Sequence, residues 1–521
     1  MEALRTPLRI GFEWAESALD RVFGPDLNPL AQLGTLGFFL FWVVAGTGMY
    51  LFAFFDTGIE NAYGSVEWYT TVHWWHAGLA RSVHRYASDL MVVVLALHLL
   101  REFSLDRYRG KRWFSWFTGV PLIWFLYASG ITGYWLVWDR LAQYVAIATT
   151  ELLDRLPIFG EPIARNFLTD GSLTSRFFTL LIFLHIAVPL IMLLVMWIHI
   201  QRISRPRVNP AMPLGSALGI ALLVVSLADP AVSQGPADLM KVPSPVGLDW
   251  FYLPLYPLID VSRGAVWVLL AAATVVLAAL PWLPPLRRPV AVVDLAHCNG
   301  CNRCVEDCPY EALRLVPRTD DLPFARQVEV DASKCVSCGI CMGACPSSTP
   351  FRRSEDLATG IDLPDLPLVT VRARVLEIAG RLRAAGDGPR ILVIACEHGA
   401  AAGRVEPTLT LPCVAMAPPS LIDFALSRGL ADGVLIAGCA ERSCYNRSGV
   451  AWTRERIAQE RDPYLRARVP RERIATVWAS PSEHDRMRRA VEAFAAGLAR
   501  LPDRDGPVAA ETPAFSPEEA P

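Results

Sequence analysis

The chain has 521 residues, enough for several domains, and 53% of them are hydrophobic, with the apolar residues concentrated before residue 285. Its formal net charge of −2 excludes a general electrostatic attraction to nucleic acid. All twelve cysteines lie after residue 297, where their close spacing favours metal ligation in a reducing compartment over a framework of disulfide bonds.

The first 30 residues mix charged and apolar side chains, which is typical of an amphipathic helix on a membrane surface and not of a cleavable signal peptide. Six apolar segments follow, and we predict that they cross the membrane. They are residues 33–54, 80–101, 114–137, 176–199, 214–228 and 264–283. The fifth is short, at the lower end of the usual length of a spanning helix.

Basic residues indicate how these segments are oriented. Arginine and lysine gather in the connections after the second, fourth and sixth segments, whereas the loop 56–79 has none. Because positively charged loops stay on the cytoplasmic side, we expect both termini in the cytoplasm of a bacterium and the spans in its inner membrane. An even number of spans agrees with this orientation.

Four histidines lie in the second and fourth segments with one spacing: His84 and His98, then His185 and His199, each pair fourteen residues apart. A histidine within a membrane span is costly unless it has a partner, which makes it a functional candidate. Fourteen helical residues rise about 21 Å and complete almost four turns, so each pair lies on one helix face. The spacing predicts two stacked bis-histidine sites that fit two b-type haems, with four unrelated core histidines as the alternative.

Glycines repeat this spacing in the first and third segments: Gly34 and Gly48, then Gly119 and Gly133. Glycine lets a flat macrocycle approach the helix backbone closely, so we interpret the four as part of the haem-binding bundle. Packing of small residues between membrane helices is the alternative interpretation.

Several stretches resemble cytochrome b of the respiratory and photosynthetic quinol complexes, the quinol–cytochrome c reductase and plastoquinol type. They are Ala80-Arg-Ser-Val-His84, His98-Leu-Leu-Arg101, Gly130-Ile-Thr-Gly-Tyr-Trp-Leu-Val-Trp138 and the segment Thr149–Phe178. The likeness covers about residues 30–285.

This resemblance implies that His84 and His185 hold an outer haem, and that His98 and His199 hold an inner one. It also implies that Arg81 pairs with a haem propionate, which is a charge-assisted contact. Cytochrome b proteins are dimers, so the resemblance further implies a homodimer.

Two residues are candidates for quinone chemistry. Leu248-Asp-Trp-Phe251 stands where the cytochrome b family has Pro-Glu-Trp-Tyr at its outer quinol site, with the acid shortened to Asp249. A simple loop carboxylate is the alternative for Asp249. Arg202, close after His199, is the candidate on the inner side, and an ordinary arginine at the membrane interface is its alternative.

Eight cysteines form two runs of one pattern, Cys-x2-Cys-x2-Cys-x3-Cys-Pro, which resembles the bacterial ferredoxin with two 4Fe–4S clusters. In this pattern the fourth cysteine of each run binds the other cluster. One cluster is predicted on Cys298, Cys301, Cys304 and Cys345, and the other on Cys308, Cys335, Cys338 and Cys341. Zinc is the alternative, and it would favour paired cysteines at a wider separation.

The last four cysteines are Cys396, Cys413, Cys439 and Cys444. Two of them follow short predicted strands, Ile391–Ala395 and Gly433–Ala437, and sites on open sheets gather at such strand ends. The stretch Gly433–Arg447 resembles the delta (iron–sulfur) subunit of methyl-viologen-reducing hydrogenase, and the likeness covers about residues 389–480. It implies one 2Fe–2S cluster, with zinc as the alternative, and electron exchange with a heterodisulfide-reductase-like flavoprotein.

We therefore predict a multi-domain chain: an all-α transmembrane haem bundle of about six spans, a ferredoxin-like α+β domain and a small α/β domain. The predicted parts are an amphipathic segment at 1–30, a four-helix dihaem domain at 31–210, two further spans at 211–290, a ferredoxin domain at 291–350, a helical linker at 351–388, a 2Fe–2S domain at 389–500 and a disordered tail at 501–521. Helices are expected near 418–428 and 484–500.

The sequence has no GxGxxG motif after a strand and no P-loop, so we expect the primary dehydrogenase on another chain. The predicted function is a membrane electron relay. A cytoplasmic flavoprotein or heterodisulfide-reductase-like iron–sulfur protein delivers electrons, which pass through the 2Fe–2S and 4Fe–4S clusters to the haems and reduce quinone. Two alternatives stay open: quinol oxidation that drives electrons to low-potential cytoplasmic acceptors, or a wiring and docking subunit whose quinone chemistry lies on another chain.

Overall fold

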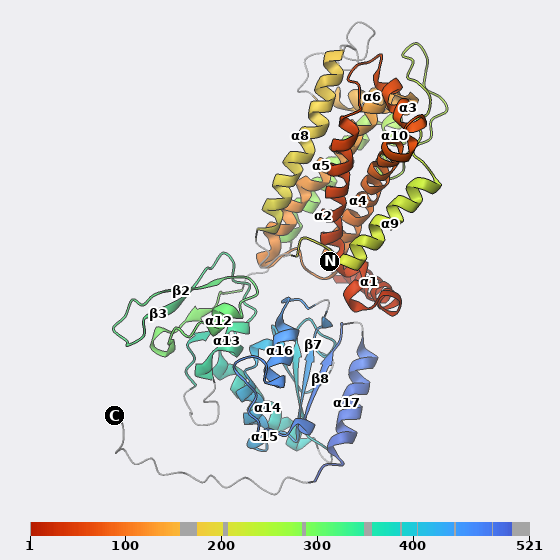
Figure 1. Cartoon of the computed structure of the whole chain (residues 1–521). Helices are drawn as coiled ribbons and strands as arrows, with labels where there is room; N and C mark the ends of the chain where they lie inside the picture. Colours follow the sequence, from red (N-terminus) through yellow and green to blue (C-terminus); the bar gives the residue numbers. More distant parts are fainter. Residues whose placement is uncertain are drawn as a thin grey trace. The chain divides into compact units, whose positions relative to one another are not determined.

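The computed structural model describes residues 2–156, 175–201, 207–283, 288–348, 357–385, 388–403, 405–441, 444–481 and 483–502. The chain divides into two compact units, Met1–Leu286 and Arg287–Pro521. The first unit is built from helices and their connections, and the second combines helices with small sheets (Figure 1). From residue 503 onward, the predicted disordered tail lies outside the described residues.

Long apolar sequence stretches form the helices of the first unit. Their bounds are α1 Glu2–Phe23, α2 Leu33–Phe52, α3 Ala62–Thr71, α4 Leu79–Ser104, α5 Trp113–Val137, α6 Arg140–Leu153, α8 Ser175–Ile200, α9 Met212–Ala228, α10 Tyr256–Val261 and α11 Arg263–Ala279. Among the described residues, five helical stretches are long and apolar enough to cross a membrane: Pro29–Phe52, Trp74–Ser104, Trp113–Val137, Phe178–Ile200 and Arg263–Trp282. They coincide with five of the six predicted spans and make this a multi-pass membrane protein.

The sixth predicted span is α9, whose 17 residues rise only about 25 Å, less than the roughly 30 Å hydrocarbon layer. Its two ends still lie at opposite ends of the bundle. The Ala211 amide donates to Gln32 just before α2 (2.8 Å), and the Ala231 amide donates to Ser82 near the start of α4 (3.0 Å). Because α2 and α4 run antiparallel, α9 passes along the bundle, although it is shorter than the five spanning stretches.

The first unit is built around two packed helix pairs, α2 with α4 and α5 with α8. Buried side chains such as Leu40, Met91 and Leu126 form a shared core between them. The amphipathic α1 is attached to this bundle by an ion pair between Glu16 and Arg101 (2.8 Å), whose side chains are only 5% and 6% exposed. The predicted N-terminal helix is thus anchored by a buried charge pair.

The cysteine-rich part of the second unit contains short elements around two antiparallel strand pairs. The elements are β1 Val292–Val293, α12 Arg303–Glu306, β2 Leu313–Pro317, β3 Arg326–Val330, α13 Ile340–Ala344 and β4 Ile361–Asp362. Strand β2 pairs with β3, with Leu313 opposite Val330, and β1 pairs with β4. The two short helices each contain one of the cysteines of the ferredoxin-like runs.

The rest of the second unit is a parallel four-stranded sheet in the order β6-β5-β7-β8. The strands are β5 Ile391–Cys396, β6 Thr408–Leu411, β7 Gly433–Gly438 and β8 Ile474–Trp478, and the helices are α14 Leu368–Ala384, α15 Pro419–Ser427, α16 Gly449–Ala458 and α17 His484–Leu498. The predicted strands in β5 and β7 and the predicted helices in α15 and α17 are confirmed. Strands β6 and β8 were not predicted, because both are short and mix threonine with apolar residues.

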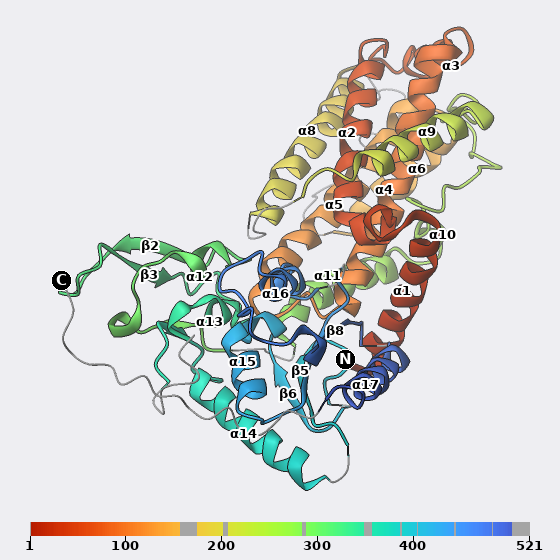
Figure 2. The ribbon, with the colours of Figure 1, turned by 60° about the horizontal axis from the view of Figure 1, so that its bottom comes forward.

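Helices cover both faces of this sheet (Figures 1 and 2). Side chains of a strand alternate between the two faces. Leu392 and Ile394 of β5 face α14 and α15, whereas Val393 faces α17. Helix α14 falls in the segment predicted as a linker, yet its buried residues pack on β5 and β6. It is therefore part of the core of the α/β fold.

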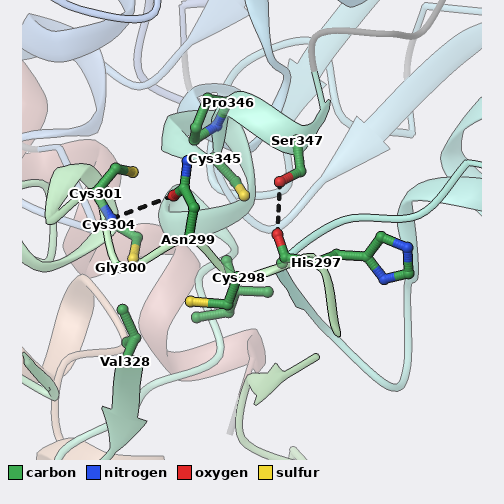
Figure 3. A pocket seen from close by; sticks show the side chains of 12 residues that line it. His297, Cys298, Asn299, Gly300, Cys301, Cys304, Val328, Cys345, Pro346 and Ser347 are labelled. Carbon is green, nitrogen blue, oxygen red and sulfur yellow. Dashed lines mark hydrogen bonds between the residues drawn. The ribbon is translucent and has the colours of Figure 1, made fainter. Parts of the chain in front are cut away.

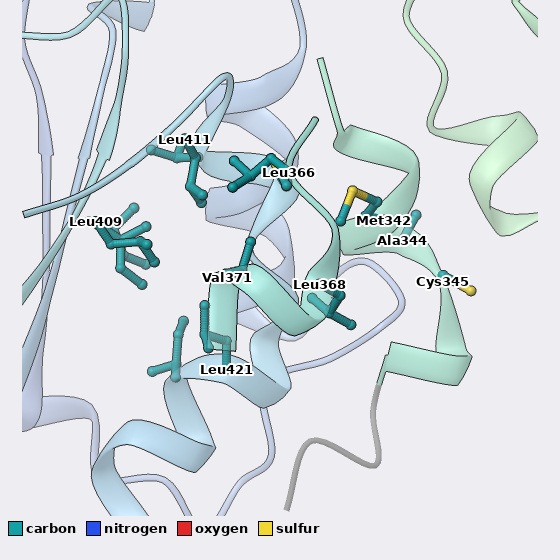
Figure 4. Packing of buried hydrophobic residues seen from close by; sticks show 14 of the residues in the cluster. Met342, Ala344, Cys345, Leu366, Leu368, Val371, Leu409, Leu411 and Leu421 are labelled. Atoms are coloured by element: carbon teal, nitrogen blue, oxygen red, sulfur yellow. The ribbon is translucent and has the colours of Figure 1, made fainter. Parts of the chain in front are cut away.

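One continuous hydrophobic core joins the cysteine-rich part to the sheet. Figure 4 shows Met342 and Ala344 of α13 in the same cluster as Leu368 of α14 and Leu409 of β6. A buried ion pair between Asp307 and Arg456 of α16 also links the two parts, and Arg461 contacts the same carboxylate at 2.6 Å. The second unit is thus held together by both apolar burial and a paired charge.

Arg456→Ala should destabilise the second unit by about 3 kcal/mol, because it breaks a buried ion pair. This value is at the lower end of the range for such pairs, since Arg461 still faces the Asp307 carboxylate. The Tm for loss of cluster absorption in the full-length protein would measure this. Arg454→Ala, on the same helix, is the control, because its pair with Glu441 is 55% and 51% exposed. That variant should cost less than about 1 kcal/mol. Equal losses of Tm would contradict a special role for the buried pair.

Candidate functional site

At one level of the bundle, His84 of α4 and His185 of α8 face each other, with ring centroids 6.4 Å apart and planes tilted by 58°. The Nδ1 atom of His84 lies 3.0 Å from the Val44 carbonyl oxygen, and that of His185 lies 3.0 Å from the Ser129 carbonyl oxygen. A carbonyl can only accept, so Nδ1 carries the proton and donates it in both rings. The Nε2 lone pair of each ring is then available to a metal.

The second histidine pair lies about 21 Å away along the helix axes, fourteen residues further on. Here His199 of α8 lies near His98 of α4, and the Nδ1 atom of His199 lies 3.1 Å from the Thr118 hydroxyl. The structure thus brings the four predicted histidines together in two pairs, one above the other.

The four glycines lie against these rings. A Cβ atom on Gly48 would lie 3.0 Å from Cε1 of His84, and one on Gly133 would lie 2.9 Å from Cε1 of His185. On Gly119 it would lie 3.3 Å from Cε1 of His199, and on Gly34 3.6 Å from Cε1 of His98. A larger residue would fill the space beside each imidazole, so these residues fit a pair of haems.

Three threonines complete the arrangement, and the sequence analysis missed them. Thr47, Thr118 and Thr132 each stand just before one of the glycines. Their hydroxyls lie 3.1 to 3.2 Å from Nδ1 of His84, His199 and His185 respectively. The repeated Thr-Gly dipeptide is the sequence signal that could have identified them. Of the four glycines, only Gly34 follows a different residue, Leu33.

The remaining predicted residues of the membrane unit have different surroundings. Arg81 donates to Thr70 (2.6 Å) and Ser233 (2.9 Å), near Glu67, and its pairing with a propionate stays a prediction. Asp249 is buried, accepts a hydrogen bond from the Tyr134 hydroxyl and pairs with Arg85 at 2.8 Å. Arg202 lies outside the described residues.

The eight ferredoxin-type cysteines line two separate cavities. The first is lined by Cys298, Cys301, Cys304 and Cys345, with His297 and Ser347 at its edge (Figure 3). The second is lined by Cys308, Cys335, Cys338 and Cys341. Each cavity therefore combines three cysteines of one run with the last cysteine of the other, the combination that a two-cluster ferredoxin uses.

Seven of these eight cysteines are buried or partly buried, and Cys301 is exposed. Burial raises the pKa of the Cys338 thiol to about 12, and neighbouring thiols add to the shift. Such thiols are protonated at neutral pH unless a metal displaces the proton, which is what iron does when it binds thiolate. The donor set and its enclosure fit 4Fe–4S clusters, which supply one-electron transfer when bound.

The last four cysteines meet at the carboxyl ends of two neighbouring strands. Cys396 ends β5 and Cys439 follows β7, with their sulfurs 3.4 Å apart. Cys413 and Cys444 join them from two loops, and all four residues are at most 5% exposed. Among the described residues, no three His, Cys, Asp or Glu side chains converge as the ligands of a single metal ion do.

A charged and aromatic group adjoins this four-cysteine site and was not predicted. The His398 and Tyr445 rings stack, with their centroids 3.6 Å apart. The Arg288 guanidinium donates two hydrogen bonds to the Glu397 carboxylate, each 2.9 Å long. Burial raises the pKa of the Glu397 carboxyl, but hydrogen bonds from His398 and Arg288 outweigh it and leave that pKa below its usual value. Glu397 and His398 follow Cys396, and Tyr445 follows Cys444, which was the available signal for these three residues.

Three family models match the chain, in the order of its domains. Residues 19–206 match cytochrome b/b6/petB, residues 297–349 match the 4Fe–4S dicluster domain, and residues 404–502 match the delta subunit of methyl-viologen-reducing hydrogenase. The three predicted resemblances are thereby confirmed. Cys396 lies before the third matched range, and the pairing of β5 with β6 and β7 brings it to the other cysteines.

Two individual proteins are similar to part of the chain. Cytochrome b of Acanthamoeba castellanii is 25% identical over 295 residues, which are 50% of this chain and 74% of that protein. A solved chain of a hyperthermophilic respiratory Complex III covers 48% of this chain and 74% of its own length, at 22% identity and a TM-score of 0.39. The family matches by themselves make the chain a membrane electron-transfer protein with a haem b domain and a 4Fe–4S domain.

Gly48→Val should abolish haem binding at the His84–His185 level, because its side chain would occupy the space beside the His84 ring. Haem per chain, measured by extraction, should fall by about half, and one of two reduced-minus-oxidised absorption components should vanish. Gly46→Val is the matched control on the same helix, since a Cβ there meets no atom within 4 Å. Normal haem content in Gly48→Val would contradict the assignment.

Cysteine replacements should reveal the shared ligand sets. Cys345→Ser should perturb the same electron paramagnetic resonance signal as Cys301→Ser, because both line the first cavity. Cys308→Ser should instead perturb the signal that Cys335→Ser perturbs. Iron content per chain serves as the folding control. A Cys345→Ser variant that changes only the Cys335-dependent signal would show that each run binds its own cluster.

Proposed function

We propose that the chain is a membrane-bound electron relay between a soluble protein and quinone. A cytoplasmic flavoprotein or heterodisulfide-reductase-like iron–sulfur protein delivers electrons to the four-cysteine site, which holds a 2Fe–2S cluster. The electrons continue through the two ferredoxin-type sites to the two histidine pairs, and quinone is reduced in the membrane. The membrane is the bacterial inner membrane, with the second unit in the cytoplasm.

The observation that carries this proposal is a contact within the second unit. Ile340 of α13, Cys413 and Trp452 of α16 are buried together, and Cys338 packs against them. Cys338 lines the second ferredoxin-type cavity, and Cys413 belongs to the four-cysteine site. Electrons exchanged between these two sites therefore cross packed side chains and no solvent.

The backbones at this junction are equally close. A Cβ atom on Gly343 of α13 would overlap the Ala415 carbonyl oxygen, so the backbones of the two parts touch there. The Arg456 guanidinium donates to the same Ala415 carbonyl at 2.9 Å. Because backbone cannot move aside as a side chain can, the two sites are held at a fixed separation, which suits repeated electron transfer.

The first ferredoxin-type cavity differs in its exposure. Its Cys301 is exposed, whereas the cysteines of the four-cysteine site are all buried. We infer that the first cavity passes electrons out of the second unit and that the second cavity receives them from the four-cysteine site. The delta-subunit match supports a soluble hydrogenase- or heterodisulfide-reductase-type partner at the other end.

The membrane unit supplies the other half of the relay. Its two histidine levels offer one redox site toward each side of the membrane, and Asp249 lies with the outer level as the quinone candidate there. Arg202 remains the candidate on the inner side. The homodimer also stays a prediction that rests on the cytochrome b likeness.

The test uses the full-length protein in liposomes, with reduced methyl viologen as donor and a short-chain ubiquinone analogue as acceptor. Quinone should be reduced, with transient haem reduction seen by absorption. Cys413→Ser should slow the reaction at least about tenfold, equivalent to about 1.4 kcal/mol in the barrier. Ser448→Ala, which keeps all four cysteines, should leave the rate unchanged.

Other outcomes favour the alternatives. Reduction of the haems and clusters by added quinol, without their oxidation by added quinone, would favour the reverse direction. If the protein neither reduces quinone nor oxidises quinol while its haems and clusters are intact, the result would favour a wiring and docking subunit. An undiminished rate in Cys413→Ser would remove the four-cysteine site from the path.

A further inference from the structure

A buried group of charged side chains lies in the membrane unit outside the haem ligands. Arg85 of α4 bridges two carboxylates: its Nε atom donates to Asp89 (3.0 Å) and its Nη2 atom lies 2.8 Å from Asp249. The carboxylate side chains are 10% and 2% exposed, whereas that of Arg85 is 35% exposed. Asp89 had no predicted role, and only the fold brings it to Asp249.

The charges of this group do not balance if both acids are ionised. Two carboxylates beside one guanidinium leave one uncompensated negative charge, which is costly in a low-dielectric interior. Two close carboxyls avoid this by sharing a proton. The other titratable groups that face them among the described residues are all phenols: Tyr86, Tyr127, Tyr134 and Tyr252.

Hydrogen bonds indicate which acid holds the proton. Both oxygens of Asp249 accept: Oδ1 from the Phe251 amide (2.7 Å), and Oδ2 from the Tyr134 hydroxyl and Arg85. Such bonds favour the ionised form. In contrast, Oδ1 of Asp89 is buried and receives no hydrogen bond from any described residue. An ionised oxygen in that position would be unsatisfied, whereas a protonated Asp89 can donate its hydrogen to the neighbouring Asp249 carboxylate.

We propose that Asp89 and Asp249 share one proton beside Arg85, that Asp89 holds it, and that Asp89 exchanges it with the aqueous side along the partly exposed Arg85. This deepens the proposed function and rests on it, because quinone reduction takes up two protons with two electrons and quinol oxidation releases them. When quinone is reduced, the Asp89 carboxylic acid gives one of the two protons and becomes a carboxylate. When quinol is oxidised, the Asp89 carboxylate takes up one proton. Water supplies or takes up the second proton.

The proposal is tested without quinone, by infrared spectroscopy of the oxidised, full-length protein in H2O and D2O. The wild type should show a carbonyl band of a protonated carboxyl that shifts in D2O. Asp89→Asn should lose this band. Asp249→Asn should also lose it, although Asp89 is intact, because one carboxylate beside Arg85 then ionises. A purely structural role for Asp249 would not produce that loss.

Asp260→Asn is the matched control, because this exposed carboxylate also accepts from a tyrosine, Tyr144, at 2.7 Å. It should leave the band unchanged. Haem content reports folding, and if Asp89→Asn fails to fold, Asp89→Glu should keep the band at a shifted position. A wild type without the band, or a band that survives both asparagine variants, would overturn the proposal. Loss of quinone reactivity with the band intact would count against the proposed function alone.

Discussion

The membrane unit depends on how an imidazole ring is satisfied between apolar helices. Each ring needs an acceptor for Nδ1, because an unpaired polar nitrogen is costly away from water, and open space along the ring edge at Cε1. One turn of the facing helix meets both needs: a carbonyl and a threonine hydroxyl accept from Nδ1, and the next residue is glycine. The same turn occurs opposite His84 and His185, which ties the spacing of the glycines to that of the histidines.

In the second unit, a shared core sets the spacing of the candidate cluster sites. Small cysteine-rich domains have little core of their own, and here the core continues from α13 into the parallel sheet. The buried pair of Asp307 and Arg456 crosses the same junction. Since buried charges tolerate only one geometry, the pair restricts the relative position of the two parts more than apolar packing alone would.

The charged group around Arg85 is the main departure from an apolar bundle. Asp89 and Asp249 come from a transmembrane helix and a distant loop, and each would be unfavourable alone. Gly130 makes room for the Tyr252 ring, which packs over α5 close to this group. A bundle that served only to hold haems would not need two buried acids, which is why the group points to proton chemistry.

Residue type and spacing were enough to predict the histidine pairs, the cysteine runs, the domain order and the longest helices, because each follows from local periodicity or from ligand geometry that repeats along the chain. The sequence did not determine the threonine contacts, the place of α14 in the sheet core, the junction of Cys338 with Cys413, or the meeting of Asp89 with Asp249. Those contacts join residues far apart in the chain, and only the packing of whole helices and strands decides which side chains share a buried space.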